Sequence, residues 1–343
     1  MNSLDLTSKN SRAISWWLFI TLILVGAMIV LGGATRLTNS GLSITEWKPI
    51  TGALPPLSHE AWLIEFEKYK QIPEFEAEHP DMKLRGFEFI YFMEWSHRQL
   101  GRIIGLVYTL PFFYFLLRGK LKGYTLKYLA IVLLIWLQGA IGWWMVHSGL
   151  SDDRVDVSQY RLAVHLGAAF VILGLLFWFW RDNVEGRVAK APVAVMTKRA
   201  KFLAGLIYAQ ILAGAFVAGT HSGKSYNTWP LMDGGLVPNG YFIQSPVWRN
   251  IFENAAAIQF NHRVLAYIIT AVAIWMALSS RQMRHLQKPV GVLLLLILWQ
   301  LGLGIWTLLA VAPLNLSLLH QFSSIFVFLA GLWLWRSASR SHA

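Results

Sequence analysis

Eight long apolar segments alternate with polar connections along this chain. They lie at about 15–33, 89–117, 128–147, 161–180, 202–220, 257–279, 290–312 and 315–335. A helix that crosses a hydrocarbon core of about 30 Å needs about 20 mainly apolar residues. The pattern therefore predicts an all-α integral membrane protein with eight transmembrane helices.

The composition agrees with this class and limits the chemistry. The chain is 55% hydrophobic and only 14% charged, with a mean hydropathy of +0.47, values typical of membrane proteins. It contains no cysteine, which excludes disulfides, thiolate metal sites and iron–sulfur clusters. Redox chemistry in this protein would need a bound cofactor held by histidine or other ligands.

The net charge of +12 is distributed as a topology signal. Basic residues gather at the N-terminus, in the second, fourth and sixth connections and in the C-terminal tail: Lys9, Arg12, Arg118, Lys120, Lys122, Lys127, Arg181, Arg187, Lys190, Lys198, Arg199, Lys201, Arg281, Arg284, Lys288, Arg336 and Arg340. Most acidic residues lie in the other connections. Because cytoplasmic loops carry the excess of Lys and Arg, both termini are predicted to be cytoplasmic, and the charge indicates no nucleic-acid partner.

The second half of the sequence repeats features of the first. The stretch 138–142 parallels 300–304, and the Trp- and Pro-containing stretch 45–55 parallels 228–238. With four helices in each repeat, both halves enter the membrane in the same direction, as parallel repeats related by an axis near the membrane normal. We predict two four-helix bundles, residues 1–183 and 202–343, joined by a cytoplasmic linker at 184–201.

Four histidines lie a few residues inside the same end of four apolar segments: His97, His165, His262 and His320. At about 1.5 Å per residue, each is roughly 24–32 Å from the arginine that ends its segment on the cytoplasmic side. All four are therefore expected near the outer leaflet, at similar depth.

An imidazole inside a bilayer needs a partner, and three kinds of partner are considered. A histidine can hydrogen bond across helices. It can bind zinc, although zinc sites usually add cysteine or carboxylate in a tetrahedral set. Two histidines from facing helices can also fill both axial positions of a haem iron. One pair per half at matched depth favours two haem sites.

Two arginines follow these histidines directly: Arg98 after His97 and Arg263 after His262. A guanidinium near the outer boundary can pair bidentately with haem propionates. It can equally be an interfacial arginine whose stem crosses apolar surface to reach water.

Glu94 breaks the symmetry between the halves. It lies three residues before His97 and so shares its helix face, whereas the equivalent position in the second half is Gln259. The difference suggests that one bundle performs chemistry and the other supplies a cofactor. The alternative is that Glu94 only pairs with Arg98 or Arg102, since ion pairs at this spacing are common.

Other polar features are assigned to turns and loops. His147 and His221 each begin a His-Ser-Gly tripeptide at the end of an apolar segment, which favours a helix-to-loop turn. The first outer loop, about 36–86, is the longest connection, and loops of this length are usually functional. It could cover a haem pocket or contact a partner.

These residues resemble the haem A synthase family over essentially the whole chain, in its cysteine-free proteobacterial and mitochondrial branch. The likeness is carried by Glu88 through Arg98 with Gly101-Arg102, Tyr69-Lys70, Pro73-Glu74, His147-Ser148-Gly149, His165, Gly219 through Gly223, Asn227 through Pro230, Asn261-His262-Arg263 and His320-Gln321. The outer-loop cysteines of the other branch are absent, so no thiol role is carried over.

The resemblance implies oxidation of a methyl group of haem O to the formyl group of haem A, for terminal oxidase assembly, in a bacterial inner membrane. His97 and His165 would face the substrate haem, with Glu94 catalytic, and His262 and His320 would ligate a haem b. Haem O synthase and oxidase assembly factors are candidate partners. The electron acceptor and the oligomeric state, including a homo-oligomer, stay open.

Two other functions compete with this one. A bis-haem cytochrome that takes electrons from quinol would use the four histidines but would give Glu94 no chemical task. A transporter built from repeats would need broken helices near the midplane, whereas the polar residues here cluster at the outer side.

Overall fold

The computed structural model describes residues 3–150, 154–185 and 195–339, with side chains from residue 12 onward. Within these ranges eight helices are long and apolar enough to cross a membrane, as predicted. They are α1 (Ser3–Leu37), α4 (Leu84–Leu117), α5 (Thr125–His147), α6 (Gln159–Glu185), α7 (Val195–Gly219), α9 (Ala255–Ser279), α10 (Arg284–Leu309) and α11 (Leu314–Ala338).

Shorter elements fill the two longest connections. Between α1 and α4 lie η1 (Thr51–Ala53), α2 (His59–Tyr69) and α3 (Pro73–Glu78). Between α7 and α9 lie η2 (Ser222–Lys224), η3 (Val247–Arg249) and α8 (Asn250–Glu253). The described part of the chain contains no β-strand, and the protein is all-α.

The long helices carry large apolar side chains on their outer faces. Leu110 of α4 and Trp136 of α5 are each 64% exposed, and Leu295 of α10 is 69% exposed. Water would not favour so many exposed apolar residues on regular helices, whereas a bilayer would cover them. The protein is therefore a multi-pass membrane protein.

The contacts divide the chain into two compact units, one formed by Ile20–Ile172 and the other by Met1–Phe19 with Leu173–Ala343. Helices α1 and α6 each contribute residues to both units. The bundles predicted at 1–183 and 202–343, and their relation as parallel repeats, stay predictions. Part of the predicted linker, 186–194, lies outside the described residues.

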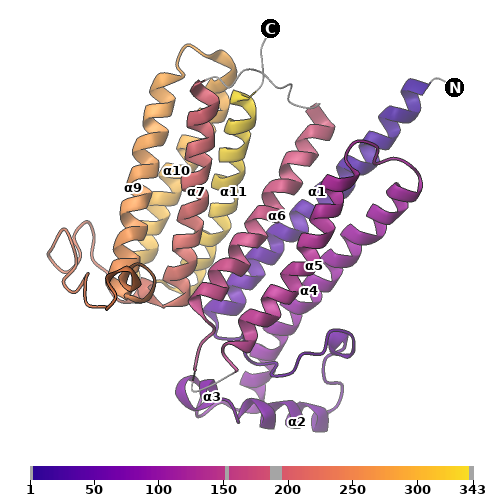
Figure 1. Cartoon of the computed structure of the whole chain (residues 1–343). Helices are drawn as coiled ribbons and strands as arrows, with labels where there is room; N and C mark the ends of the chain where they lie inside the picture. Colours follow the sequence, from indigo (N-terminus) through magenta and orange to yellow (C-terminus); the bar gives the residue numbers. More distant parts are fainter. Residues whose placement is uncertain (1–2, 151–153, 186–194, 340–343) are drawn as a thin grey trace. The chain divides into compact units, whose positions relative to one another are not determined.

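In the second unit, α7, α9, α10 and α11 pack side by side (Figure 1): α7 contacts α9 and α11, and α10 contacts the same two helices. Helix α6 is attached to α11 by an ion pair between Asp182 and Arg336. Arg336 was expected in a basic C-terminal tail, but it lies in the last turn of α11 and is only 1% exposed. A buried guanidinium requires a carboxylate partner, and Asp182 provides it.

In the first unit, the loop after α1 folds against the start of α4. Figure 1 shows α2 and α3 beyond the N-terminal end of α4. A hydrophobic cluster joins α2 and the loop to α4, and Phe75 of α3 packs against it; its members are Ile44, Phe66, Tyr69, Phe87, Ile90 and Tyr91. The first outer loop is therefore a packed segment, and it places residues 43–46 beside α4.

The two His-Ser-Gly tripeptides form turns, as the sequence indicates. His147 is the last residue of α5 and stacks on Trp143, with ring centroids 5.7 Å apart. His221 follows the end of α7 and has a φ of 52°, in the left-handed region. Asn39, after α1, has a φ of 47°. In both left-handed turns the flanking hydroxyls bond each other, Thr38 with Ser40 at 2.7 Å and Thr220 with Ser222 at 2.8 Å.

Candidate haem sites

His97 of α4 and His165 of α6 are brought together. Their ring centroids are 6.5 Å apart. Two metal–nitrogen bonds of about 2 Å each, plus about 1 Å from each nitrogen to its ring centre, would place the rings about 6 Å apart. The observed separation therefore fits two axial ligands of one metal.

Each of these histidines faces a glycine on a neighbouring helix. A Cβ atom added to Gly32 of α1 would lie 3.1 Å from His97 Nε2, and one added to Gly142 of α5 would lie 3.0 Å from His165 Cε1. His165 Nδ1 is buried and has no hydrogen-bond partner. A buried nitrogen without a partner is costly in a protein interior, and a haem iron in the pair would fit this donor set.

The second pair repeats the arrangement. A Cβ atom on Gly214 of α7 would lie 3.3 Å from His262 Cε1, and one on Gly304 of α10 would lie 3.0 Å from His320 Cε1. His262 lies on α9 and His320 on α11, and both of these helices pack against α7 and α10. Across the described residues no three His, Asp or Glu side chains gather into a metal-binding group.

These glycines provide a test of the second pair. We expect Gly304→Ala to displace the His320 ring, because overpacking of this kind forces neighbours off their rotamers, and to lower the haem retained by the purified protein by about 10-fold. Gly302→Ala is the matched control on α10, because its added Cβ would meet nothing within 4 Å. Equal haem contents in the two variants would contradict the prediction.

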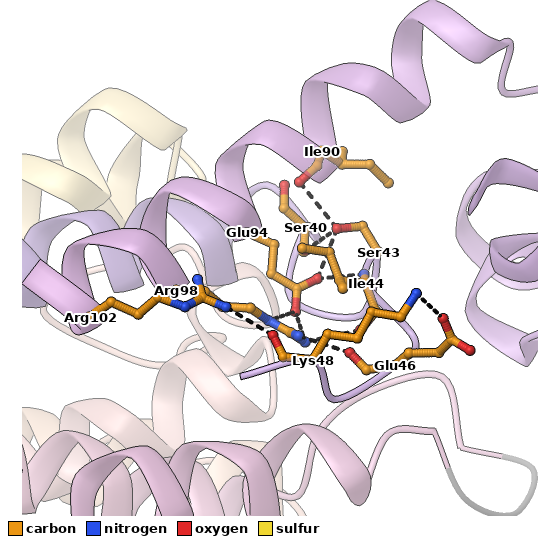
Figure 2. A network of polar contacts seen from close by, with 9 residues as sticks. All are labelled: Ser40, Ser43, Ile44, Glu46, Lys48, Ile90, Glu94, Arg98 and Arg102. Carbon is orange, nitrogen blue, oxygen red and sulfur yellow. Dashed lines mark hydrogen bonds and ion pairs between the residues drawn. The ribbon is translucent and has the colours of Figure 1, made fainter. Parts of the chain in front are cut away.

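Glu94 is 2% exposed and its carboxylate is held by four hydrogen bonds (Figure 2). Oε2 accepts from Ser43 Oγ and from the Ile44 backbone N–H, both at 2.8 Å. Oε1 accepts from Arg98 Nε at 3.0 Å and from an Arg98 terminal nitrogen at 2.6 Å. An ionised carboxylate only accepts hydrogen bonds, so this environment suits a fixed negative charge one helical turn before His97.

The arginines attach the outer loop to α4. Arg98 also donates to the carbonyl oxygens of Ile44 at 2.9 Å and Glu46 at 3.1 Å. Arg102 donates to the carbonyl of Lys48 (Figure 2) and to that of Pro49, rather than to Glu94. The ion pair considered from the sequence is therefore formed with Arg98.

Gln259 occupies the same place in the second half. Its Nε2 donates to the Ser222 carbonyl at 2.7 Å and its Oε1 accepts from Arg263 at 2.8 Å. Arg263 also donates to the carbonyls of Tyr226 and Thr228. Both arginines thus bind loop carbonyls, and their contact with haem propionates stays a prediction.

Sequence reasoning missed Ser43 as a partner of Glu94. The two residues are 51 positions apart, and a single serine in a loop carries no recognisable pattern. The glycines opposite the histidines left a better signal, because 138–142 and 300–304 are similar. That these glycines make room for the imidazole rings is evident only from how the helices pack.

A group of charged side chains lies close to Arg98 and Arg102, in the loop between α1 and α4 and on α2. Lys48 and Lys68 bind Glu46 Oε2 at 2.6 and 2.7 Å, and these hydrogen bonds lower the pKa of Glu46 to about 2. Between this group and the arginines is a cavity of about 20 Å³, room for about one water, lined by Ile44, Glu46, Lys48, Gly52, Glu65, Tyr91, Arg98 and Arg102.

Glu74 of α3 is predicted to make the stability of the folded protein depend on pH. Burial raises its pKa to about 8, although Tyr69 Oη donates to it at 3.3 Å and acts in the opposite direction. The folded protein therefore holds a proton that the unfolded chain releases near its ordinary pKa of 4.5. This contribution to stability is fully present below that pH and is lost as the pH rises towards 8.

We expect Glu74→Gln to remove this loss and to stabilise the protein at pH 8 relative to wild type, by an amount on the order of a few kcal/mol. Thermal unfolding of the purified protein at pH 5 and pH 8 measures it. Glu76→Gln, an exposed position on the same helix, should leave the wild-type difference between the two pH values unchanged. If Glu74→Gln shows the same difference in stability between pH 5 and pH 8 as the wild type, Glu74 is not the source of the pH dependence.

Comparison with known proteins identifies the family. The sequence profile of the cytochrome oxidase assembly protein family matches residues 15–332. The chain belongs to this family. Three of its relatives, each named heme A synthase, align along nearly their whole length. The protein of Maricaulis maris is 50% identical, over 94% of this chain and 95% of its own. Those of Parvibaculum lavamentivorans and Nitrosomonas eutropha are 43% and 45% identical, over 97% and 98% of this chain and 96% of each relative.

Proposed function

We propose that this protein oxidises a methyl group of haem O to the formyl group of haem A. The observation that carries the proposal is the His97–His165 pair, at a spacing suited to one haem iron, with the buried carboxylate of Glu94 one helical turn away. Membership of the family and the names of the relatives agree with it.

In this proposal His97 and His165 bind the iron of the substrate haem O. Glu94 takes part in the oxidation of the methyl group. Its carboxylate is held by Ser43, Ile44 and Arg98, so it does not need to reorganise during the reaction. A preorganised charge of this kind stabilises positive charge that develops as electrons leave the methyl group. Glu94 is 2% exposed, so its carboxylate is shielded from bulk solvent.

The resident cofactor proposed for the second pair is haem b, held by His262 and His320. Gly214 and Gly304 leave the space that the two imidazoles occupy. When bound, a haem b supplies a centre that accepts and passes on single electrons. Arg98 and Arg263 are proposed to lie near the propionates of the two haems, in addition to their loop contacts.

The finer setting is proposed with the function. The chain would lie in a bacterial inner membrane with both termini in the cytoplasm, and its halves would be parallel four-helix repeats. Haem O synthase, oxidase assembly factors and an electron acceptor are the proposed partners. The basic connections on one side of the membrane support the orientation.

The orientation is tested by reporter fusions. A reporter enzyme that works only in the periplasm should be active when it is fused after Glu76, in the exposed part of α3. A reporter that works only in the cytoplasm should be active when it is fused after Lys122, between α4 and α5. Reversed labelling would place the histidine pairs near the inner leaflet and would overturn the orientation.

The function itself is tested by haem analysis of cells that make haem O, with and without this protein. Formation of a formyl-bearing haem only in its presence supports the enzyme. Unchanged haem types, together with haem bound to both histidine pairs, would support the quinol cytochrome instead.

A further inference from the structure

Glutamine side chains hold three of the four histidines. Gln210 Nε2 donates to the His262 carbonyl at 3.0 Å and lies 3.2 Å from both ring nitrogens. Gln300 Nε2 donates to the His320 carbonyl at 2.9 Å and lies 3.3 and 3.4 Å from the ring nitrogens. An amide nearly equidistant from both nitrogens lies over the ring face, which restricts rotation of the ring.

Gln138 Nε2 donates to the His165 carbonyl at 2.7 Å, so it holds the backbone at His165, whereas the ring nitrogen Nδ1 has no partner. Each glutamine lies four residues before the glycine that faces the same histidine, so that each helix presents a glutamine and a glycine on one face. The pairs are Gln138 with Gly142, Gln210 with Gly214, and Gln300 with Gly304.

His97 differs from the other three. It faces Gly32, and four residues before that glycine is Met28. The Met28 methyl group lies 3.5 Å from the Cβ position of Gly101, one turn beyond His97, so Met28 packs against α4 near His97. A thioether has no N–H to donate and is flexible. Within the described residues, His97 makes no side-chain hydrogen bond.

We propose that Gln138, Gln210 and Gln300 are positioning residues that fix His165, His262 and His320, and that Met28 leaves His97 as the releasable ligand of the substrate haem. This inference rests on the proposed function. A resident haem is served by two fixed ligands, whereas a substrate haem must enter and its product must leave. The releasable ligand is then the one beside Glu94.

Reciprocal substitutions test the proposal on the full-length purified protein. Haem O is added with no electron acceptor present, and its release to excess apomyoglobin is followed, with each released haem identified by chromatography. Met28→Gln should slow release of haem O by roughly 3- to 10-fold, as expected for one added hydrogen bond. Met28→Leu, which adds no donor, should release it at the wild-type rate.

The reverse change is made at the second pair. Gln210→Met should speed release of haem b by about 10-fold, the usual effect of losing a group that orients a metal ligand. It should also shift the electron paramagnetic resonance of the low-spin ferric haem, because that signal depends on the angle between the ligand rings. Gln287→Met, at an exposed glutamine that bonds only a loop carbonyl, should change neither.

Release of haem O from Met28→Gln at the rate of Met28→Leu would overturn the proposal. If Met28→Gln does not fold, Gln138→Met decides, because it should speed release of haem O and an unchanged rate would refute the idea. Failure of the proposed function looks different: haem O binding would then be unaffected by His165→Ala.

Discussion

Replacing Glu94 with glutamine will lower haem A formation by about 100- to 10,000-fold, the usual effect of losing one positioned acid–base or charged group, while haem b stays bound. The side chains are equal in size, and Gln259 shows that an amide can bond an arginine one turn later in this scaffold. The variant loses the negative charge next to His97. Its amide nitrogen would face the Ile44 N–H, a local mismatch that costs about 1–3 kcal/mol.

The measurement is chromatography of haems extracted from membranes, with haem b per protein as the check on folding. Glu88→Gln is the control, because it removes a carboxylate from the same helix at a half-buried position that is not next to His97. It should make haem A at the wild-type level. If Glu94→Gln does so too, Glu94 only attaches the 43–46 loop through Arg98, and the proposed division of labour between the two pairs loses its main support.

Replacing His262 or His320 with alanine is expected to remove the low-spin haem b that is proposed for the second pair. Either change leaves the iron with one protein ligand. The loss of haem affinity should therefore exceed the roughly 10- to 100-fold loss that follows when a residue hydrogen-bonded to a metal ligand is removed. Haem A formation should fall with it, because the proposed path for electrons is broken. Haem content and the low-spin absorption bands measure the effect.

His59→Ala is the matched control. His59 is exposed at the start of α2, so this variant should keep the wild-type haem content. A His262→Ala protein with an unchanged low-spin spectrum would show that the second pair does not ligate the haem. Loss of haem b together with unchanged haem A output would show that the second site is no part of the electron path.

The two halves share one local design. In each, the residue three before a histidine binds an arginine four residues later and the loop beside it. Glu94 brings a charge to that position, whereas Gln259 brings a neutral amide that donates to the Ser222 carbonyl. The two positions thus differ by one charge on a shared local framework.

The apolar pattern alone was enough to predict the number, order and approximate bounds of the membrane helices, because a bilayer requires about 20 apolar residues with every backbone group bonded within the segment. The predicted segment 128–147, for example, is observed as Thr125–His147. The family likeness was also visible, since it is carried by short motifs such as His97-Arg98 with Glu94. These features depend on residues close together in the sequence.

Only the tertiary structure decided which distant residues meet. It places Ser43 and Ile44 against Glu94, buries Arg336 against Asp182, and opposes a glycine to each histidine. Such contacts depend on how helices rotate about their axes and how a loop packs, and several rotations are compatible with the same apolar pattern. Packing density and the need to pair buried polar groups select one of them, and that selection creates the two histidine pairs.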